Sequence, residues 1–369
     1  MTTIKDIFQT YAPEYIYRFG EAIPSEHRKV IDAIINCRTD HYGASIYQCT
    51  ECGEKHMVYR CCGNRHCPNC QHHKTRKWLQ TQLDRQLPGH HFMITFTVPQ
   101  NLRRFIRSHQ RVCYSAMFAA SSQTIKKLAA DQKHIGANMP GFFGVLHTWG
   151  RQMPYHPHIH YIVPGGALSR TDGKWHCSRI DFFLPVKAMS KIFKAKFRDI
   201  MKKNGLYPQI PADVWNQKWV VNCQAIGAGE QSIKYLAPYV FKVAISNSRI
   251  VKVEGRRVFF KYRKNKSNRW RTMALDVMEF IRRFLQHVLP TGLMKVRYYG
   301  FLHPGSSVPL EKIAALIELA FGFEIVTPKT VLEPPEPMIC TNCGKNLVFR
   351  ASLLPCKNGI CGFRVAENL

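Results

Sequence analysis

Acidic side chains are scarce in this chain of 369 residues. It has 24 Asp and Glu against 53 Lys and Arg, so its formal net charge is +29, and the basic excess runs along the whole length. A polyanion is the natural partner for such a charge, and we expect that partner to be nucleic acid.

Long apolar runs are missing as well. No stretch approaches the ~18 apolar residues that a membrane-spanning helix requires, so no membrane partner is expected. The segment Met1–Asp6 has neither a basic start followed by an apolar core nor a small-residue cleavage site, so we expect an intracellular protein, cytoplasmic and associated with the nucleoid. The nucleotide-binding pattern GxxxxGKS/T is also missing, which argues against chemistry driven by nucleotide hydrolysis.

Cysteine, by contrast, is abundant, with 14 residues that cluster at short spacings. In a reducing compartment this clustering favours metal ligation over disulfides. We expect one structural Zn²⁺ in a tetrahedral site made by two Cys-x2-Cys pairs, namely Cys49, Cys52, Cys67 and Cys70. A second, interleaved ion would take its ligands from Cys62, His66, Cys37 and His41.

The same segment is basic, with Arg65, Lys74, Arg76 and Lys77 near Trp78. We therefore expect this zinc module to contact DNA. A zinc-stapled scaffold that touches no nucleic acid is the alternative. Near the other end of the chain, a small zinc ribbon is expected from Cys340, Cys343, Cys356 and Cys361.

Four segments have the composition of strands, and two long segments have the apolar spacing of helices. Strands are expected at residues 91–98, 142–149, 158–163 and 218–226, and helices at residues 101–131 and 188–203. The order is that of a ferredoxin-like or RRM-like split βαβ sheet, in which the first and third strands are central neighbours. We predict an α+β protein.

The third predicted strand carries His158 and His160, separated by one apolar residue. Successive strand side chains point to opposite faces, so the two imidazoles share one face. Neutral imidazole is the commonest protein metal ligand, so the pair is a candidate half of a metal site. Two ordinary strand histidines on a wet face are the alternative. The third ligand stays open among His156, His147 and Gln231.

A helical segment is expected after the fourth strand, at residues 229–242. There Tyr235 and Tyr239 are four residues apart on one face, with Lys242 about a turn beyond. Pro238 is expected to kink the helix, which leaves the relative aim of the two hydroxyls open. An aromatic stripe that packs on the sheet is the alternative.

Basic and aromatic residues are interleaved over residues 249–271, with alternation through Val258–Tyr262 that predicts a hairpin. This composition suits single-stranded nucleic acid, and a solvated basic face is the alternative. Core helices are expected at residues 274–289 and 308–321, followed by a Pro-rich linker at residues 327–338.

Several of these motifs occur together in one known family. They are Cys62–Gln71, His147–Gly150 leading to His156–His160, Tyr235–Tyr239, Ala244–Ile250 and Tyr298–Leu302, in this order. With them, the chain resembles the HUH-type two-tyrosine transposases of the rolling-circle insertion-sequence group, the family named for insertion sequence 91. The resemblance spans roughly residues 35 to 305.

The resemblance implies a DNA strand transferase that acts on single-stranded DNA at element ends and on target DNA, with a homo-oligomer left open. His158 and His160 would hold Mg²⁺ or Mn²⁺ against the scissile phosphate. Tyr235 and Tyr239 would each form a 5′-phosphotyrosine, with Lys242 nearby as a catalytic cation. The rivals are a relaxase or replication initiator with the same chemistry, and a zinc-finger regulator without catalysis.

These expectations divide the chain into five parts. They are a helical and zinc-binding domain (1–88), an HUH and tyrosine catalytic domain (89–248), a basic and helical extension (249–326), the linker (327–338) and the zinc ribbon (339–369).

Overall fold

The computed structural model describes residues 2–241, 245–264, 267, 269–325, 331–333, 336–356 and 359–365. The side chains of residues 238, 239, 241, 356 and 359–365 lie outside this description. The chain divides into two compact units, each made from separate segments. The first comprises residues 1–74, 241–288 and 331–369, and the second comprises residues 75–240 and 289–330.

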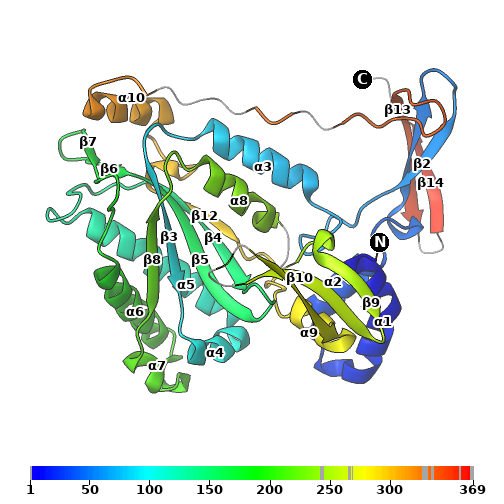
Figure 1. Ribbon diagram of the computed structural model, residues 1–369, viewed down its shortest axis with the longest axis horizontal. Coiled ribbons are helices and arrows are strands. Elements are labelled where there is room, and N and C mark those ends of the chain that lie inside the picture. The colour runs from blue at the N-terminus through cyan, green and yellow to red at the C-terminus, as the bar shows by residue number, and fades with distance from the viewer. Residues whose placement is uncertain are drawn as a thin grey trace. The chain divides into compact units, whose positions relative to one another are not determined.

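The second unit is built on a five-stranded antiparallel sheet (Figure 1). Its strands, in spatial order, are β12 (Val296–Tyr299), β4 (Phe142–Trp149), β5 (Tyr155–Pro164), β3 (His91–Thr97) and β8 (Val220–Ala225). The four strands predicted from the sequence are present, and β3 pairs with β5 as expected. The short edge strand β12 was not predicted.

One face of this sheet carries the hydrophobic core of the unit. It packs against α4 (Arg103–Ser108), α5 (Gln110–Ala129) and α6 (Val186–Lys203), which lie behind the sheet in Figure 1. Ile159 and Tyr161 of β5 point into this core and are fully buried. Because strand side chains alternate, His158 and His160 project from the opposite face. The helix predicted at residues 101–131 is interrupted at His109, whose ψ of 43° is not helical.

The opposite face is partly covered by α3 (His72–Asp84) and α8 (Glu230–Phe241), which lie above and to the right of the strands in the view of Figure 1. Helix α8 extends through Pro238 to Phe241. The unit also contains α7 (Asp213–Asn216), α10 (Leu310–Phe321), β6 (Gly166–Leu168) and β7 (Trp175–Cys177), together with short 3-10 helices.

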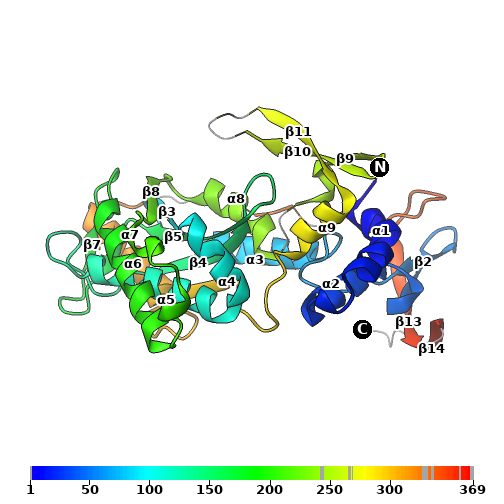
Figure 2. The ribbon, with the colours of Figure 1, turned by 90° about the horizontal axis from the view of Figure 1, so that it is seen from below.

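The first unit combines a helical pack with two small sheets. Its helices are α1 (Ile4–Phe19), α2 (Ser25–Ile35) and α9 (Val277–Leu285), and Phe8 of α1 meets Phe284 of α9 edge to face at 5.1 Å. The strands β9 (Ile250–Glu254), β10 (Arg257–Arg263) and β11 (Trp270–Asp276) form an antiparallel meander beside α9 (Figure 2). This meander contains the predicted hairpin and one strand more.

The helix predicted at residues 274–289 begins later, at Val277. Residues 274–276 belong to β11, and the Asp276 side chain caps α9 by accepting a hydrogen bond of 2.8 Å from the Met278 amide. An aspartate at this position satisfies an amide that has no partner inside the helix, so it favours a helix start there.

The other sheet of this unit joins the two ends of the chain. Its order is β14 (Gly359–Val365), β13 (Leu347–Cys356), β1 (Ala44–Cys49) and β2 (Lys55–Tyr59). Strand β13 therefore pairs with β1, about 300 residues earlier, in antiparallel register from Ala44 opposite Leu353 to Cys49 opposite Leu347. Among the helices of the described ranges, none is long and apolar enough to cross a membrane.

Candidate metal centre and cysteine clusters

Three histidines meet on the sheet face that is turned away from the core. His158 and His160 lie on β5, and His147 lies on β4 directly opposite His158. The ring centroid of His147 is 5.3 Å from that of His158 and 4.7 Å from that of His160. The centroids of the two β5 rings are 4.8 Å apart. One ligand atom from each ring lies within 4.8 Å of the others, a spacing that suits a shared metal ion.

Hydrogen bonds orient the two β5 rings. Nδ1 of His158 donates to the carbonyl oxygen of His156 at 2.7 Å. Since a carbonyl oxygen only accepts, this nitrogen carries the proton and Nε2 keeps its lone pair for a metal. Nδ1 of His160 is 2.9 Å from Oγ1 of Thr95, its cross-strand partner on β3.

Burial keeps these imidazoles uncharged. Desolvation lowers the pKa of His158 to about 4, against a weaker opposing effect of its hydrogen bond to the His156 carbonyl. Desolvation also places the pKa of His147 and of His160 well below the usual range, and the neighbouring imidazoles add to the effect. A metal ion therefore meets neutral ligands at neutral pH, without competition from protons.

The structure distinguishes among the three candidates for the third ligand. His147 completes the cluster. The ring of His156 is 5.0 Å from that of His158, but His156 does not belong to the group of converging ligand atoms. Gln231 is an exposed residue in the first turn of α8.

Arg103 is a residue near the cluster that the sequence analysis did not single out. It lies at the start of α4, half-buried, and burial lowers the pKa of its guanidinium. Its positive charge contributes to the lowered pKa of both His156 and His158. Its Nε is buried without a hydrogen-bond partner in the described part of the chain. The arrangement thus sets a partly desolvated cation near His158 of the histidine cluster, where a phosphate group could accept a hydrogen bond from it.

Tyr235 lies on α8 with 54% of its surface exposed, while Ile233 and Leu236 of the same helix are buried. Ile233 lines a pocket together with Ile162 and Pro164 of β5. These two β5 residues share the sheet face of His158 and His160 because they occupy alternate positions. Helix α8 therefore lies over the face that carries the histidines.

The other two residues predicted for this helix are described only in part. Tyr239 belongs to α8, one turn beyond Tyr235, but its side chain lies outside the described residues. Lys242 lies outside them altogether.

The first cysteine cluster consists of Cys37, Cys62, Cys67 and Cys70. Sγ of Cys70 is 3.5 Å from Sγ of Cys37 and 3.5 Å from Sγ of Cys62. The neighbouring thiols of Cys67 and Cys70 lower the pKa of Cys62 to about 5 and so favour the thiolate that a metal requires.

The second cluster consists of Cys49, Cys52, Cys340 and Cys343. Sγ of Cys343 is 3.4 Å from that of Cys49 and 3.5 Å from that of Cys52, and the Cys52 and Cys340 sulfurs are 3.7 Å apart. Four thiolates at this spacing match a closed tetrahedral zinc site.

This grouping differs from the one predicted. The Cys-x2-Cys pairs at Cys49 and at Cys67 do not share an ion, since each belongs to a different cluster. Cys37 and Cys62 lie in one cluster as expected, but Cys67 and Cys70 take the places expected for His66 and His41. His66 instead accepts a hydrogen bond from Nε of Arg65 at 3.3 Å. Pairing of β13 with β1 brings Cys340 and Cys343 to the N-terminal cysteines, so they are not partners of Cys356 and Cys361 in a separate ribbon. The side chains of these last two lie outside the described residues.

The basic meander β9–β11 is a candidate nucleic-acid surface. Trp270 on β11 is 52% exposed, and the guanidinium of Arg263 lies 5.1 Å from its ring centroid. On the neighbouring strands, the Lys252 amine lies 5.2 Å from the Phe259 ring. An aromatic ring flanked by cations can stack on a base while the cations contact phosphates.

The segments that carry these clusters match two families of known proteins. A family described as "Transposase zinc-binding domain" matches residues 7–98, which include six of the eight clustered cysteines. A second family, described as "Putative transposase", matches residues 141–308, which include the three histidines and both tyrosines.

Two curated proteins are similar over most of their length. "Putative transposase y4qJ" of Sinorhizobium fredii (strain NBRC 101917 / NGR234) is 34% identical over 346 residues, which cover 86% of each chain. "Transposase for insertion sequence element IS801" of Pseudomonas savastanoi pv. phaseolicola is 25% identical over 362 residues, 88% of this chain and 83% of the other. No solved structure matches.

Proposed function

Since this chain belongs to the insertion sequence 91 family of two-tyrosine transposases, we propose that it moves DNA as single strands, cutting and rejoining them through a 5′-phosphotyrosine intermediate. The observation that carries this proposal is the convergence of His147, His158 and His160 on the sheet face over which α8 lies. The strand order β4-β5-β3-β8 supports an assignment of this unit to the ferredoxin-like HUH class.

The three imidazoles fit a divalent cation, and we propose that they hold one against the scissile phosphate. When bound, such an ion would polarise a phosphoryl oxygen and stabilise the charge that develops during attack. Three nitrogen donors favour Mn²⁺ over Mg²⁺, because Mg²⁺ strongly prefers oxygen ligands.

Tyr235 and Tyr239 are the proposed nucleophiles. The phenolic oxygen of one attacks the phosphorus, and the bond from phosphorus to the 3′-side oxygen breaks as that oxygen takes up a proton. The product is a 5′-phosphotyrosine and a free 3′-hydroxyl, and the phenolic proton is lost to solvent or a base. The two tyrosines are one helical turn apart, so they can each hold one DNA end during an exchange.

Arg103 is the proposed phosphate-binding cation of this site. Partial burial near His156 and His158 removes its Nε from water, and a phosphodiester would supply the acceptor that this Nε lacks among the described residues. In this role Arg103 binds the strand but does not exchange protons with it.

The test is the formation of a covalent complex. The protein is incubated with a labelled single-stranded oligonucleotide from an element end and Mn²⁺, and the mixture is denatured and separated by electrophoresis. We expect a protein–DNA band with the wild-type protein. Tyr235→Phe or Tyr239→Phe alone should weaken this band, and the double change should abolish it. Tyr17→Phe, at an exposed tyrosine of α1, is the control. A band that survives the double change would refute the nucleophile assignment. If folded wild-type protein binds the oligonucleotide but gives no band, the result would favour a non-catalytic DNA-binding protein.

A further inference from the structure

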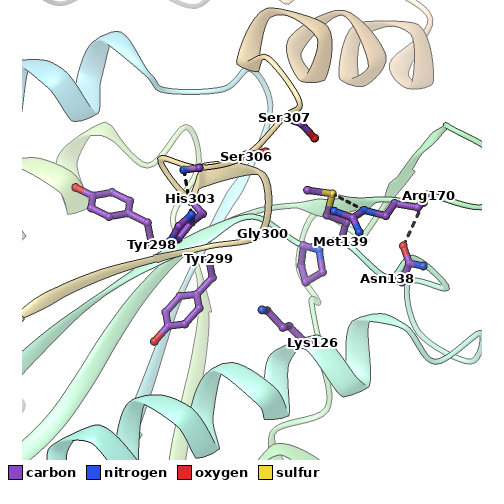
Figure 3. A pocket seen from close by; sticks show the side chains of 12 residues that line it. Lys126, Asn138, Met139, Arg170, Tyr298, Tyr299, Gly300, His303, Ser306 and Ser307 are labelled. Carbon is purple, nitrogen blue, oxygen red and sulfur yellow. Dashed lines mark hydrogen bonds between the residues drawn. The ribbon is translucent and has the colours of Figure 1, made fainter.

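The motif Tyr298-Tyr299-Gly300 borders a pocket that the proposed chemistry does not use. The pocket has a volume of about 390 Å³, within the usual range for small-ligand sites of ~300–1,000 Å³. It is lined by the last part of α5, by residues 138–140 and Arg170, and by the end of β12 with the loop after it (Figure 3).

The backbone of the loop after β12 requires glycine at position 300. Its φ is +59°, and an added Cβ would lie 1.8 Å from the carbonyl oxygen of Pro140. Only glycine allows the loop after β12 to come this close to residue 140. The close approach forms the wall of the pocket.

The charged side chains of the lining, Lys126 and Arg170, are both positive. Lys126 extends from α5 toward the pocket, His303 lies on the loop after β12, and Arg170 lies on the far side beside Met139 (Figure 3). No Asp or Glu is among the lining residues of the described chain. Among the described residues, Nε of Arg170 contacts the weakly accepting sulfur of Met139 at 3.3 Å, so its guanidinium retains donors for a stronger acceptor.

The loop adds polar donors. Ser306 Oγ accepts from the amide of Val308 at 3.2 Å, which leaves its own hydroxyl hydrogen available, and Ser307 stands beside it. Hydroxyl, ammonium and guanidinium donors around a cavity without carboxylates form a setting for phosphate oxygens.

The two tyrosine rings, in contrast, are already engaged. Tyr298 Oη accepts from Nε1 of Trp78 at 2.9 Å. The Tyr299 ring stacks on Phe142 at 4.9 Å and has the Lys126 amine 5.6 Å from its centroid. The Tyr298 ring lies 5.9 Å from the Phe143 ring and has the Arg85 guanidinium 5.8 Å from its centroid. These contacts do not favour stacking of a base on either tyrosine.

We propose that this pocket binds the phosphodiester backbone of a DNA strand, without base specificity and separately from the histidine cluster. The inference rests on the proposed single-strand activity, because that activity requires the strand to be held beyond the scissile phosphate. The pocket contributes positioning and affinity, whereas the histidines and tyrosines carry the chemistry.

The experiment compares the double variant Lys126→Ala/Arg170→Ala with the control Lys127→Ala/Lys174→Ala. All four residues are exposed, so both proteins should fold, and the control pair removes the same charge from neighbouring positions outside the pocket. Binding of a fluorescent single-stranded oligonucleotide is followed by anisotropy at several NaCl concentrations, with two unrelated sequences.

The pocket variant should lower the magnitude of the slope of log K against log[salt] by about 1.4, which is ~0.7 for each lost phosphate contact. The loss should be the same for both sequences and clearly smaller in the control. Equal slopes in the two variants would overturn the proposal, and a loss confined to one sequence would show base recognition instead.

A competition experiment distinguishes binding of a DNA strand from binding of a small free phosphate anion. Unlabelled oligonucleotide should compete at far lower concentration than inorganic phosphate or a nucleoside monophosphate, and equal competition would overturn the assignment to a DNA strand. Covalent-complex formation is measured in parallel on wild-type protein. If the slope changes but no covalent product forms, the pocket proposal holds and the proposed cleavage is refuted. If a covalent product forms but the slopes are unchanged, the proposed cleavage holds and the pocket proposal is refuted.

Discussion

Burial determines the chemistry of the individual histidines in this protein. A solvent-exposed imidazole is partly protonated near neutral pH, whereas His147, His158 and His160 stay neutral because a charged ring would lose its hydration. They are therefore ready to bind a metal. The same desolvation makes Arg103 a cation that gains more from a phosphate than an exposed arginine would.

His147 is expected to be the third metal ligand. His147→Gln should weaken Mn²⁺ binding about 10- to 100-fold, at least as much as the loss of a partner that merely orients a ligand. His156→Gln is the matched control, because it keeps the backbone carbonyl that holds His158 and should have a smaller effect. Isothermal titration with Mn²⁺ measures both affinities, and a larger loss in the His156 variant would contradict the assignment.

Arg103 is expected to act on the DNA strand at the cleavage site. Arg103→Ala should reduce the rate of covalent-complex formation by about 100-fold, as the removal of one positioned donor at a developing charge does. Arg104→Ala removes the same charge from an exposed neighbour and should leave the rate within a few-fold of wild type. Single-turnover rates on a pre-bound oligonucleotide provide the comparison, and equal rates in the two variants would refute the role.

His91 makes folding sensitive to acid. Burial lowers its pKa to about 4 in the folded protein, while the unfolded chain keeps a value near ~6.5. The unfolded state thus binds the proton first, so stability is complete above pH 6.5 and falls as the pH drops toward 4, by on the order of 3 kcal/mol at most. Urea unfolding across this range should show a shallower loss for His91→Gln than for wild type. The exposed His134→Gln should follow wild type, and parallel curves for all three proteins would contradict the account.

At the scale of elements, strand pairing decides what the cysteines and histidines can do. Periodicity sufficed to predict β3, β4, β5 and β8, because each alternates or is continuously apolar and ends at a turn. The strand β12 was missed because four residues carry too little pattern. The third ligand could not be chosen from the sequence because it depends on the register of β4 against β5, which places His147 opposite His158.

The cysteine clusters illustrate the same limit. Spacing alone identifies Cys-x2-Cys pairs but does not say which pairs share an ion. The long-range pairing of β1 with β13 joins Cys49 and Cys52 to Cys340 and Cys343, a contact that local sequence cannot reveal. The start of α9 was likewise hidden, since residues 274–276 fit a helix by apolarity but extend β11 up to the Asp276 cap.

Zinc content tests this regrouping. Cys343→Ser should lower the zinc content from two ions to one per chain and reduce the melting temperature, because β1 and β13 lose the ion that links them. Cys356→Ser should retain both ions, since four other cysteines complete the second cluster. Elemental analysis after gel filtration, with thermal melts, gives the answer. If the Cys343 variant kept both ions and the Cys356 variant lost one, the results would instead support a separate zinc ribbon.

At the scale of the whole molecule, the chain is a basic DNA transposase whose charge is used in both units. The meander β9–β11 presents cations around Trp270 in one unit, and the pocket below Gly300 presents Lys126 and Arg170 in the other. A net charge of +29 favours binding to DNA, and in the proposed function the histidine face and α8 form the place where a strand is cut. On this proposal, mutation of the meander or of the pocket should weaken DNA binding without removing the groups that carry out the cleavage.

Mapping of the DNA-linked peptide tests the central claim most directly. After reaction with single-stranded element-end DNA and Mn²⁺, the complex is digested with protease and nuclease, and the modified peptide is identified by mass spectrometry. We expect a 5′-linked nucleotide on Tyr235 or Tyr239, and no such peptide when His158 and His160 are both changed to Ala. A nucleotide attached to another residue, or an unchanged yield in the histidine variant, would contradict a metal-assisted tyrosine nuclease built on this sheet face.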